Sequence, residues 1–179
     1  KDVLRADQML NPLMGHEKFF RFPYLNEGSD LKVRNKMRTW LRSHGYRHGA
    51  VSIDNDDYIF SWALNQAKAT GKDIPDAQVR QLFVEHIVGA ADFYNQLAIE
   101  TLGRSPKHVL LLHEMDATVL FLESLVNVLR NSGWDLVSAA EAYEDPMYSQ
   151  FVENTYGNNG IVAQLAYDKT GVQFKYDQF

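Results

Sequence analysis

Short apolar runs alternate with longer amphipathic segments along this chain. Near-continuous apolar or aromatic runs are typical of strands that are buried on both faces of a sheet. They predict strands at residues 18–22, 49–53, 108–112 and 134–137. Apolar positions three or four residues apart predict helices at residues 30–43, 57–69, 75–102, 116–131 and 139–143. Residues 147–179 are polar and aromatic, and no periodic pattern assigns them to an element.

Strands that alternate with helices in this way indicate a parallel sheet covered by helices, and so the α/β class of folds. Either a (β/α) barrel or an open doubly wound sheet fits the pattern. Four strands are predicted here, whereas a closed barrel has about eight. We therefore expect a small open sheet or part of a larger barrel. Neither an internal repeat nor a Pro/Gly/Ser-rich linker divides the chain, which predicts a single domain over residues 1–179.

Composition narrows the classes of partner. The 179 residues include 18 Lys and Arg against 23 Asp and Glu, which gives a net charge of −5. That charge, without a basic run, argues against nucleic acid as a partner. No apolar stretch approaches the roughly 18 residues of a membrane-spanning helix. The chain has no cysteine, which excludes disulfides, thiolate nucleophiles and Cys-based zinc sites.

Chemically active side chains follow three of the predicted strands. Arg21 lies at the end of the first strand and His113 at the end of the third. Asp54 ends the second strand, and Asp57 comes shortly after it. The carboxyl ends of parallel strands form one face of an α/β fold, and that face carries the active site. We therefore expect Arg, Asp and His side chains to converge there.

Each of these residues also has a purely structural interpretation. Arg21 can pair with a neighbouring helix. Asp54 is suited to cap the next helix, and Asp57 can lie in its first turn, where the helix dipole favours an acid. His113 follows a run of apolar residues and can be a core histidine with satisfied hydrogen bonds. Their joint placement at three successive strand ends is what favours a functional site.

Three short motifs follow one another at these strand ends. Residues 21–24 are Arg-Phe-Pro-Tyr, residues 54–58 are Asp-Asn-Asp-Asp-Tyr, and residues 109–113 are Val-Leu-Leu-Leu-His. In this order they resemble the Arg-x-Pro-Tyr, Asp-x-x-Asp-Trp and Leu-Leu-His motifs of the polysaccharide deacetylases, the NodB-homology carbohydrate esterases. Tyr58 stands where the family has Trp. The resemblance covers residues 19–143 and implies part of a distorted (β/α) barrel, with parallel strands and outer helices.

Two further motifs of that family do not occur in this sequence. One is Thr-Phe-Asp-Asp-Gly, which supplies the general base and a metal ligand. The other is His-Ser/Thr-x-x-x-His, which supplies two more ligands. Both precede the Arg-x-Pro-Tyr motif in the family, and residues 1–17 contain neither. The resemblance thus implies the C-terminal portion of a longer domain. Its divalent metal, with zinc the expected ion, would be held by a preceding N-terminal part or companion fragment and by no residue of this chain.

The resemblance implies an enzyme that hydrolyses acetyl groups from N-acetylated sugars of a polysaccharide or peptidoglycan. It also implies an exported location, either periplasmic or extracellular. In that reaction Arg21 orients the general base, and the Tyr24 N–H helps the metal bind the oxyanion. His113 protonates the leaving amine as general acid. Asp57 pairs with His113 and keeps it charged.

The same resemblance assigns substrate contacts to Pro23, Asp54, Tyr58 and Leu111. Leu111 lines the pocket for the acetyl methyl group, and Tyr58 forms a wall of the sugar groove. Chitin oligomers, peptidoglycan and acetylated xylan stay open as substrates, and xylan would make the reaction an ester hydrolysis. The alternative is a non-catalytic fragment or metal-free relative that binds carbohydrate or has a structural role. Because the base and the metal ligands are lacking, we expect these 179 residues alone to be inactive.

Overall fold

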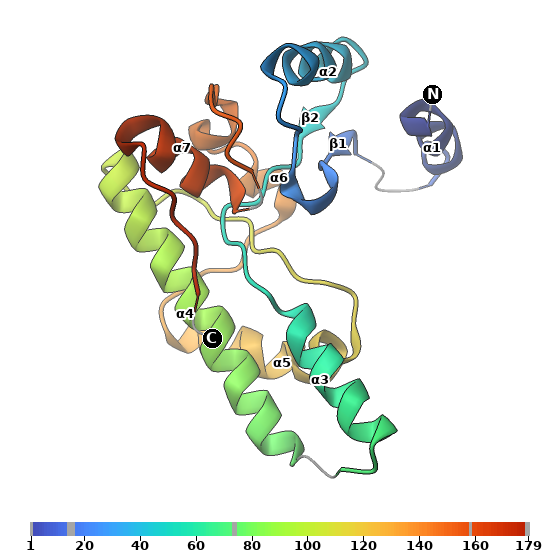
Figure 1. Ribbon diagram of the computed structural model, residues 1–179, viewed down its shortest axis with the longest axis vertical. Helices are drawn as coiled ribbons and strands as arrows, with labels where there is room; N and C mark the ends of the chain where they lie inside the picture. Colours follow the sequence, from blue (N-terminus) through green and yellow to red (C-terminus); the bar gives the residue numbers. More distant parts are fainter. Residues whose placement is uncertain (1, 14–16, 73–74, 158, 178–179) are drawn as a thin grey trace.

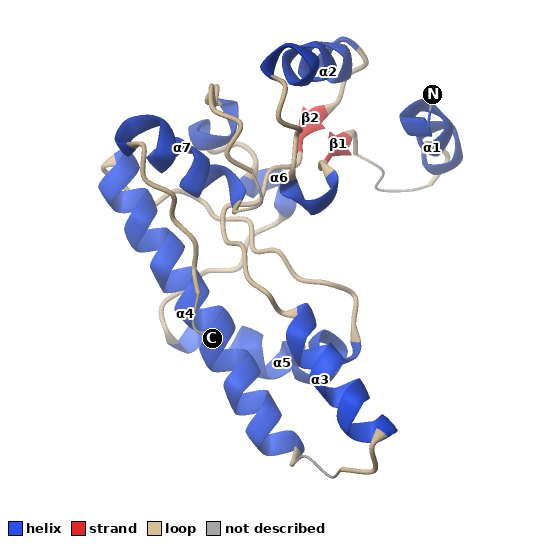
Figure 2. Cartoon of the chain, in the orientation of Figure 1, coloured by secondary structure: helices blue, strands red, loops and turns tan. Residues whose placement is uncertain are grey.

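The computed structural model describes residues 2–13, 17–72, 75–157 and 159–177, and the chain is mostly helical (Figures 1 and 2). The described helices are α1 (Asp2–Leu10), α2 (Leu31–Ser43), α3 (Tyr58–Ala69), α4 (Asp76–Leu102), α5 (Asp116–Asn131), α6 (Ala139–Ala142) and α7 (Gly160–Thr170). The other described elements are the 3₁₀ turns η1 (Pro23–Leu25) and η2 (Pro146–Ser149) and the strands β1 (Phe19–Phe20) and β2 (Arg47–His48). None of the described helices is long and apolar enough to cross a membrane.

The strand segments pair in parallel, as the sequence predicts. β1 lies beside β2. Beyond β2 the chain comes alongside the third predicted strand, where Ile53 and Leu110 form a parallel bridge. The N–H of Ile53 donates to Val109 O at 3.1 Å, and the N–H of Leu111 donates to Ile53 O at 3.0 Å. Residues 47–53 therefore lie between the first and third predicted strands, and the fold is a mixed α/β one.

The strands are shorter and fewer than predicted. In the described part of the chain the sheet has two strands, and it does not close into a barrel. The prediction of a strand at residues 134–137 is wrong, because these residues form no ladder with any described segment. Leu136 and Val137 are 50% and 43% exposed. An apolar run becomes a strand only where its backbone finds a neighbour to pair with.

All five predicted helices are present, and each begins and ends within one residue of its prediction. Their boundaries follow from local chemistry. The Asp30 carboxylate accepts from the N–H of Val33 at 2.9 Å and so caps the start of α2. Gly103 ends α4 in the left-handed conformation, with φ of 75°. Such signals depend on neighbours in sequence, and this is why they can be predicted without the fold.

The core forms around α4, which packs against both α5 and α7 (Figure 1). Phe83 and Ile87 of α4 are fully buried, and the Phe83 ring lies 5.8 Å from the ring of Phe121 on α5. Leu125 of α5 and Val162 of α7 are buried in the same cluster. This packing holds α5 against α4, α3 packs on α5, and the candidate site lies at the starts of α3 and α5.

The structure also assigns part of the segment that the sequence leaves open. Residues 160–166 of α7 are all buried. At the start of this helix the N–H of Ile161 donates to Val51 O at 2.7 Å. α7 is thereby attached to the chain just before Asp54 and Asp57.

Candidate functional site

Asp57 and His113 form a closely bonded pair. The side chain of Asp57 is 1% exposed, and its Oδ1 lies 2.5 Å from Nδ1 of His113. Its other oxygen accepts the backbone N–H of His113 at 2.7 Å. An ionised carboxylate can only accept hydrogen bonds, so Nδ1 of the imidazole carries the proton and donates it. The ring is thus fixed at one nitrogen, while the side chain as a whole is 40% exposed.

Two neighbours hold this pair in place, and the sequence did not single them out. Asn55 Oδ1 accepts from the N–H of Asp57 at 3.0 Å, while Asn55 Nδ2 donates to Leu111 O at 2.7 Å. Thr118 Oγ1, at the start of α5, donates to Asp57 Oδ2 at 3.4 Å. The signal for Asn55 was its place inside the second motif. Nothing local marks Thr118, because it approaches Asp57 only through the fold.

The geometry decides two of the structural interpretations. Asp57, not Asp54, occupies the N-cap position of α3, and its carboxylate makes no capping hydrogen bond there. His113 is too exposed to be a core histidine. The Asp57 carboxylate is therefore used to hold His113, not to start the helix.

Burial, and then the negative charge of Asp56, raise the pKa of Asp54 from 3.8 to about 7. Lys175 opposes this rise, and its Nζ lies 3.4 Å from Asp56 Oδ2. A positive charge on His113, when that ring is protonated, would also lower the pKa of Asp54. The ring of Tyr58 meets the His113 ring edge-on at 5.6 Å. Asp54, Tyr58 and His113 thus gather at the start of α3.

Replacing Asp54 with Asn is expected to stabilise the protein above pH 7. The folded protein keeps the Asp54 proton up to about pH 7, whereas the unfolded chain releases it near pH ~4. Ionisation therefore lowers the free energy of unfolding between these two values. Relative to the original chain, D54N should gain roughly 2–4 kcal/mol at pH ~8 and little at pH ~4. Urea unfolding at both pH values measures this, with the exposed Asp135→Asn as control. The same gain at both pH values would contradict it.

Arg21, in the motif at residues 21–24, bonds to residues outside the Asp57–His113 pair. Nε of Arg21 donates to Gly49 O at 2.9 Å, and its Nη2 donates to Tyr143 Oη at 3.4 Å. Tyr143 follows α6 directly, so this interaction agrees with a pairing to a neighbouring helix. Within the described residues, no hydrogen bond, ion pair or ring contact joins Arg21 to Asp57 or His113.

Pro23 and Tyr24 lie in η1, next to Arg21. The Tyr24 side chain is 90% exposed, and its backbone has φ of 55°, in the left-handed region. No described residue accepts a hydrogen bond from the Tyr24 N–H. The structure thus brings Asp54, Asp57, Tyr58 and Leu111 together around His113, but it does not join residues 21–24 to them.

The side chains around this pair include residue types that can bind a metal ion. Among the described residues, no group of three or more His, Asp or Glu side chains is arranged to hold a metal ion. The Asp57–His113 pair offers two donors that already bind each other. These residues therefore do not fit a metal centre by themselves.

Compared with known proteins, the chain matches no family model, no curated protein and no solved structure. The interpretation of the site therefore depends on its own geometry and on the three motifs.

Proposed function

We propose that this chain forms the C-terminal portion of a metal-dependent deacetylase, which removes acetyl groups from N-acetylated sugars of a polysaccharide or peptidoglycan. The observation that carries the proposal is the pair of Asp57 and His113, joined by two hydrogen bonds of 2.5 and 2.7 Å. These residues are 56 positions apart in sequence, and the resemblance pairs the same two residues.

The pair suits the step that makes amide hydrolysis difficult. An amine leaves a tetrahedral intermediate only after its nitrogen has accepted a proton, and a positioned histidine supplies such protons efficiently. Asp57 holds Nδ1 of His113, so a proton on the other ring nitrogen, Nε2, is available to a substrate. Because Asp57 is buried, its charge is poorly screened by water and acts mainly on this ring. His113 is thus the general acid and Asp57 the residue that positions it.

Substrate contacts come from the surroundings of this pair. Tyr58 is 44% exposed, and its ring beside His113 offers an aromatic wall to a sugar ring. Leu111 is partly buried and lies two residues before His113, and in this proposal its apolar side chain contacts the acetyl methyl group. Within the described residues, Tyr24 is not joined to this pair and its N–H has no acceptor. That N–H lies on left-handed backbone, and it is free to donate a hydrogen bond to an oxyanion.

In this proposal the general base and the metal ligands are supplied by a polypeptide segment outside these 179 residues. When bound, the metal would polarise the acetyl carbonyl and activate a water molecule. No group of three or more His, Asp or Glu side chains among the described residues is arranged to hold a metal ion, so the part of the reaction assigned to this chain is proton donation and substrate positioning.

Acetate release from N-acetylated chito-oligosaccharides, peptidoglycan and acetylated xylan tests the proposal. The 179-residue chain alone should release no acetate above background, whereas the protein that also contains the metal-binding motifs should do so and lose activity with a chelator. Intact mass and metal content establish which species is present in each assay. Turnover by the isolated chain would contradict the division of roles. Binding of oligosaccharide by the intact protein without hydrolysis would favour a non-catalytic carbohydrate-binding domain.

A further inference from the structure

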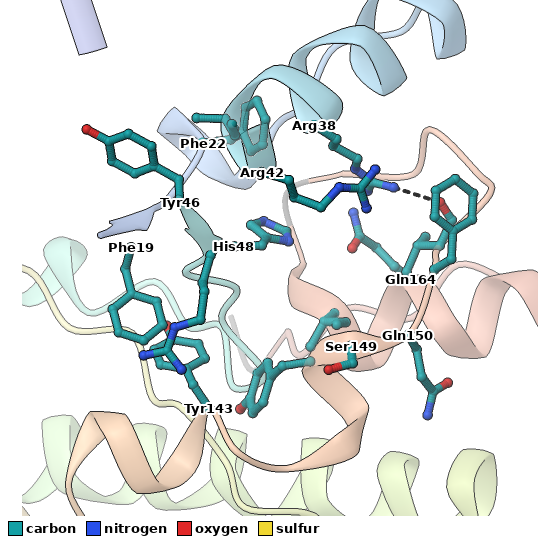
Figure 3. Close-up of a pocket in the computed structure, with 16 residues that line it drawn as sticks. Phe19, Phe22, Arg38, Arg42, Tyr46, His48, Tyr143, Ser149, Gln150 and Gln164 are labelled. Atoms are coloured by element: carbon teal, nitrogen blue, oxygen red, sulfur yellow. Dashed lines mark hydrogen bonds between the residues drawn. The ribbon is translucent and has the colours of Figure 1, made fainter. Parts of the chain in front are cut away.

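A cavity of about 350 Å³ lies apart from the Asp57–His113 pair. Its walls come from β1, β2, α2, α7 and the segment from α6 through η2 (Figure 3). Neither Asp54, Asp57 nor His113 lines it. Its volume is at the lower end of the range for sites that bind small molecules.

The charged lining of this cavity is entirely basic. Arg38, Arg42 and Arg47 contribute to it, and no carboxylate does. Arg38 is neutralised by two bonds to Glu27, of 2.6 and 2.5 Å, and Arg47 lies 3.0 Å from Glu17. The exposed Arg42 side chain makes no ion pair and no hydrogen bond with any described residue, whereas its backbone oxygen accepts from the N–H of Gly45 at 3.0 Å. Among the described residues, Arg42 is thus the cavity arginine whose charge no carboxylate balances.

Two neutral polar side chains in the same cavity also lack partners. Gln164 of α7 is 7% exposed, and among the described residues its side-chain amide has no hydrogen bond. The ring nitrogens of His48 also have no hydrogen bond with any described residue. Burial lowers the pKa of this histidine, so it is uncharged near neutral pH. Figure 3 shows Arg38 and Arg42 reaching from α2 toward Gln164, with the His48 ring facing the same space. These polar atoms are therefore open to the cavity, where a ligand or water can bond to them.

The remaining walls are rich in aromatic rings. They come from Phe19, Phe22, Tyr143, Tyr148 and Phe151. Such rings offer apolar surfaces beside the polar groups, although the Arg47 guanidinium already covers one face of Phe19 at 4.1 Å. Apolar walls with a few placed polar groups are typical of small-molecule sites.

We propose that this cavity binds a small organic anion, a carboxylate or phosphate attached to a six-membered ring. Arg42 supplies the charge, the Gln164 amide donates a hydrogen bond to an anion oxygen, and His48 bonds a polar substituent of the ring. The aromatic side chains contact the ring itself. The site is separate from the Asp57–His113 pair and does not depend on the deacetylase proposal.

Calorimetric titration of the 179-residue chain with four anions tests this: benzoate, phenyl phosphate, glucuronate and glucose 6-phosphate. Benzamide and methyl glucoside are the uncharged counterparts. At least one anion should bind with one-to-one stoichiometry and at least tenfold more tightly than its uncharged counterpart. Differences among the four distinguish carboxylate from phosphate and an aromatic ring from a sugar ring.

Variants locate the binding. Arg42→Met should weaken it at least tenfold, whereas Arg80→Met, on an exposed part of α4 outside the cavity, should leave it unchanged. Gln164→Glu keeps the size of the side chain but places a carboxylate near Arg42, and it should abolish anion binding. Binding of no anion, or equal affinity in the original chain and R42M, would overturn the proposal. If R42M does not fold, as judged by circular dichroism, Q164E provides the test: loss of anion binding supports the proposal, and unchanged affinity overturns it.

Discussion

Replacement of His113 by Asn is expected to reduce deacetylation of an N-acetylated oligosaccharide by about 10²–10⁴-fold, the usual contribution of a positioned general acid. The enzyme assayed is the protein that also supplies the base and metal ligands. Asn preserves the local structure well, because its Nδ2 can donate to Asp57 much as Nδ1 of the imidazole does at 2.5 Å. What Asn cannot do is give a proton to the leaving amine. The loss should therefore appear in kcat, with KM little changed.

A second substrate separates this role from a structural one. An aryl acetate releases a phenolate, which leaves without prior protonation, so H113N should hydrolyse it within about tenfold of the original rate. His44→Asn, in a histidine that stacks on Trp40 at the end of α2, is the matched control and should leave both rates unchanged. Equal losses on amide and aryl ester would show that His113 does not act as the acid.

The parts of the fold that depend on neighbours in sequence were predictable. Helices α2 to α6 begin and end within one residue of the prediction because their periodicity and their turn residues are local. α7 was not predicted because residues 160–166 are all buried, and a helix buried all round shows no amphipathic period. The apolar run at 134–137 was read as a strand, although its pairing depends on a neighbour that the run itself does not specify.

In the candidate site, too, some contacts follow from the sequence motifs and others depend on tertiary packing. The approach of Asp57 to His113 was expected from the order of the motifs, and the structure places the two 2.5 Å apart. Thr118 was missed because its contact with Asp57 is made only once α5 has packed. The position of Arg21 also depends on tertiary contacts, and its hydrogen bonds to Gly49 and Tyr143 take it away from His113. Motif order therefore predicted the contact of Asp57 with His113, whereas the tertiary contacts that set the position of Arg21 were not predicted from it.

Replacement of Gly160 by Ala is expected to destabilise the fold by about 2–4 kcal/mol. Gly160 has φ of 76°, and a Cβ built on it would lie 2.7 Å from Val51 O, closer than real Cβ atoms approach oxygen. The atom in the way belongs to the backbone, so it cannot turn aside as a side chain would. The same oxygen accepts from the N–H of Ile161 at 2.7 Å, and relief of the clash would lengthen this bond. For a chain of this size, the melting temperature should fall by roughly 5–15 °C.

Gly171→Ala is the matched control, because Gly171 ends the same helix with φ of 69° and has no atom within 4 Å of a built Cβ. It bears the cost of the left-handed conformation alone, about 1 kcal/mol. The difference between the two variants therefore measures the contact between α7 and Val51. A large difference would mean that the packing of α7 on Val51, in the segment that leads to Asp54 and Asp57, contributes to the stability of the fold. Equal melting temperatures for G160A and G171A would show that this contact contributes nothing to stability.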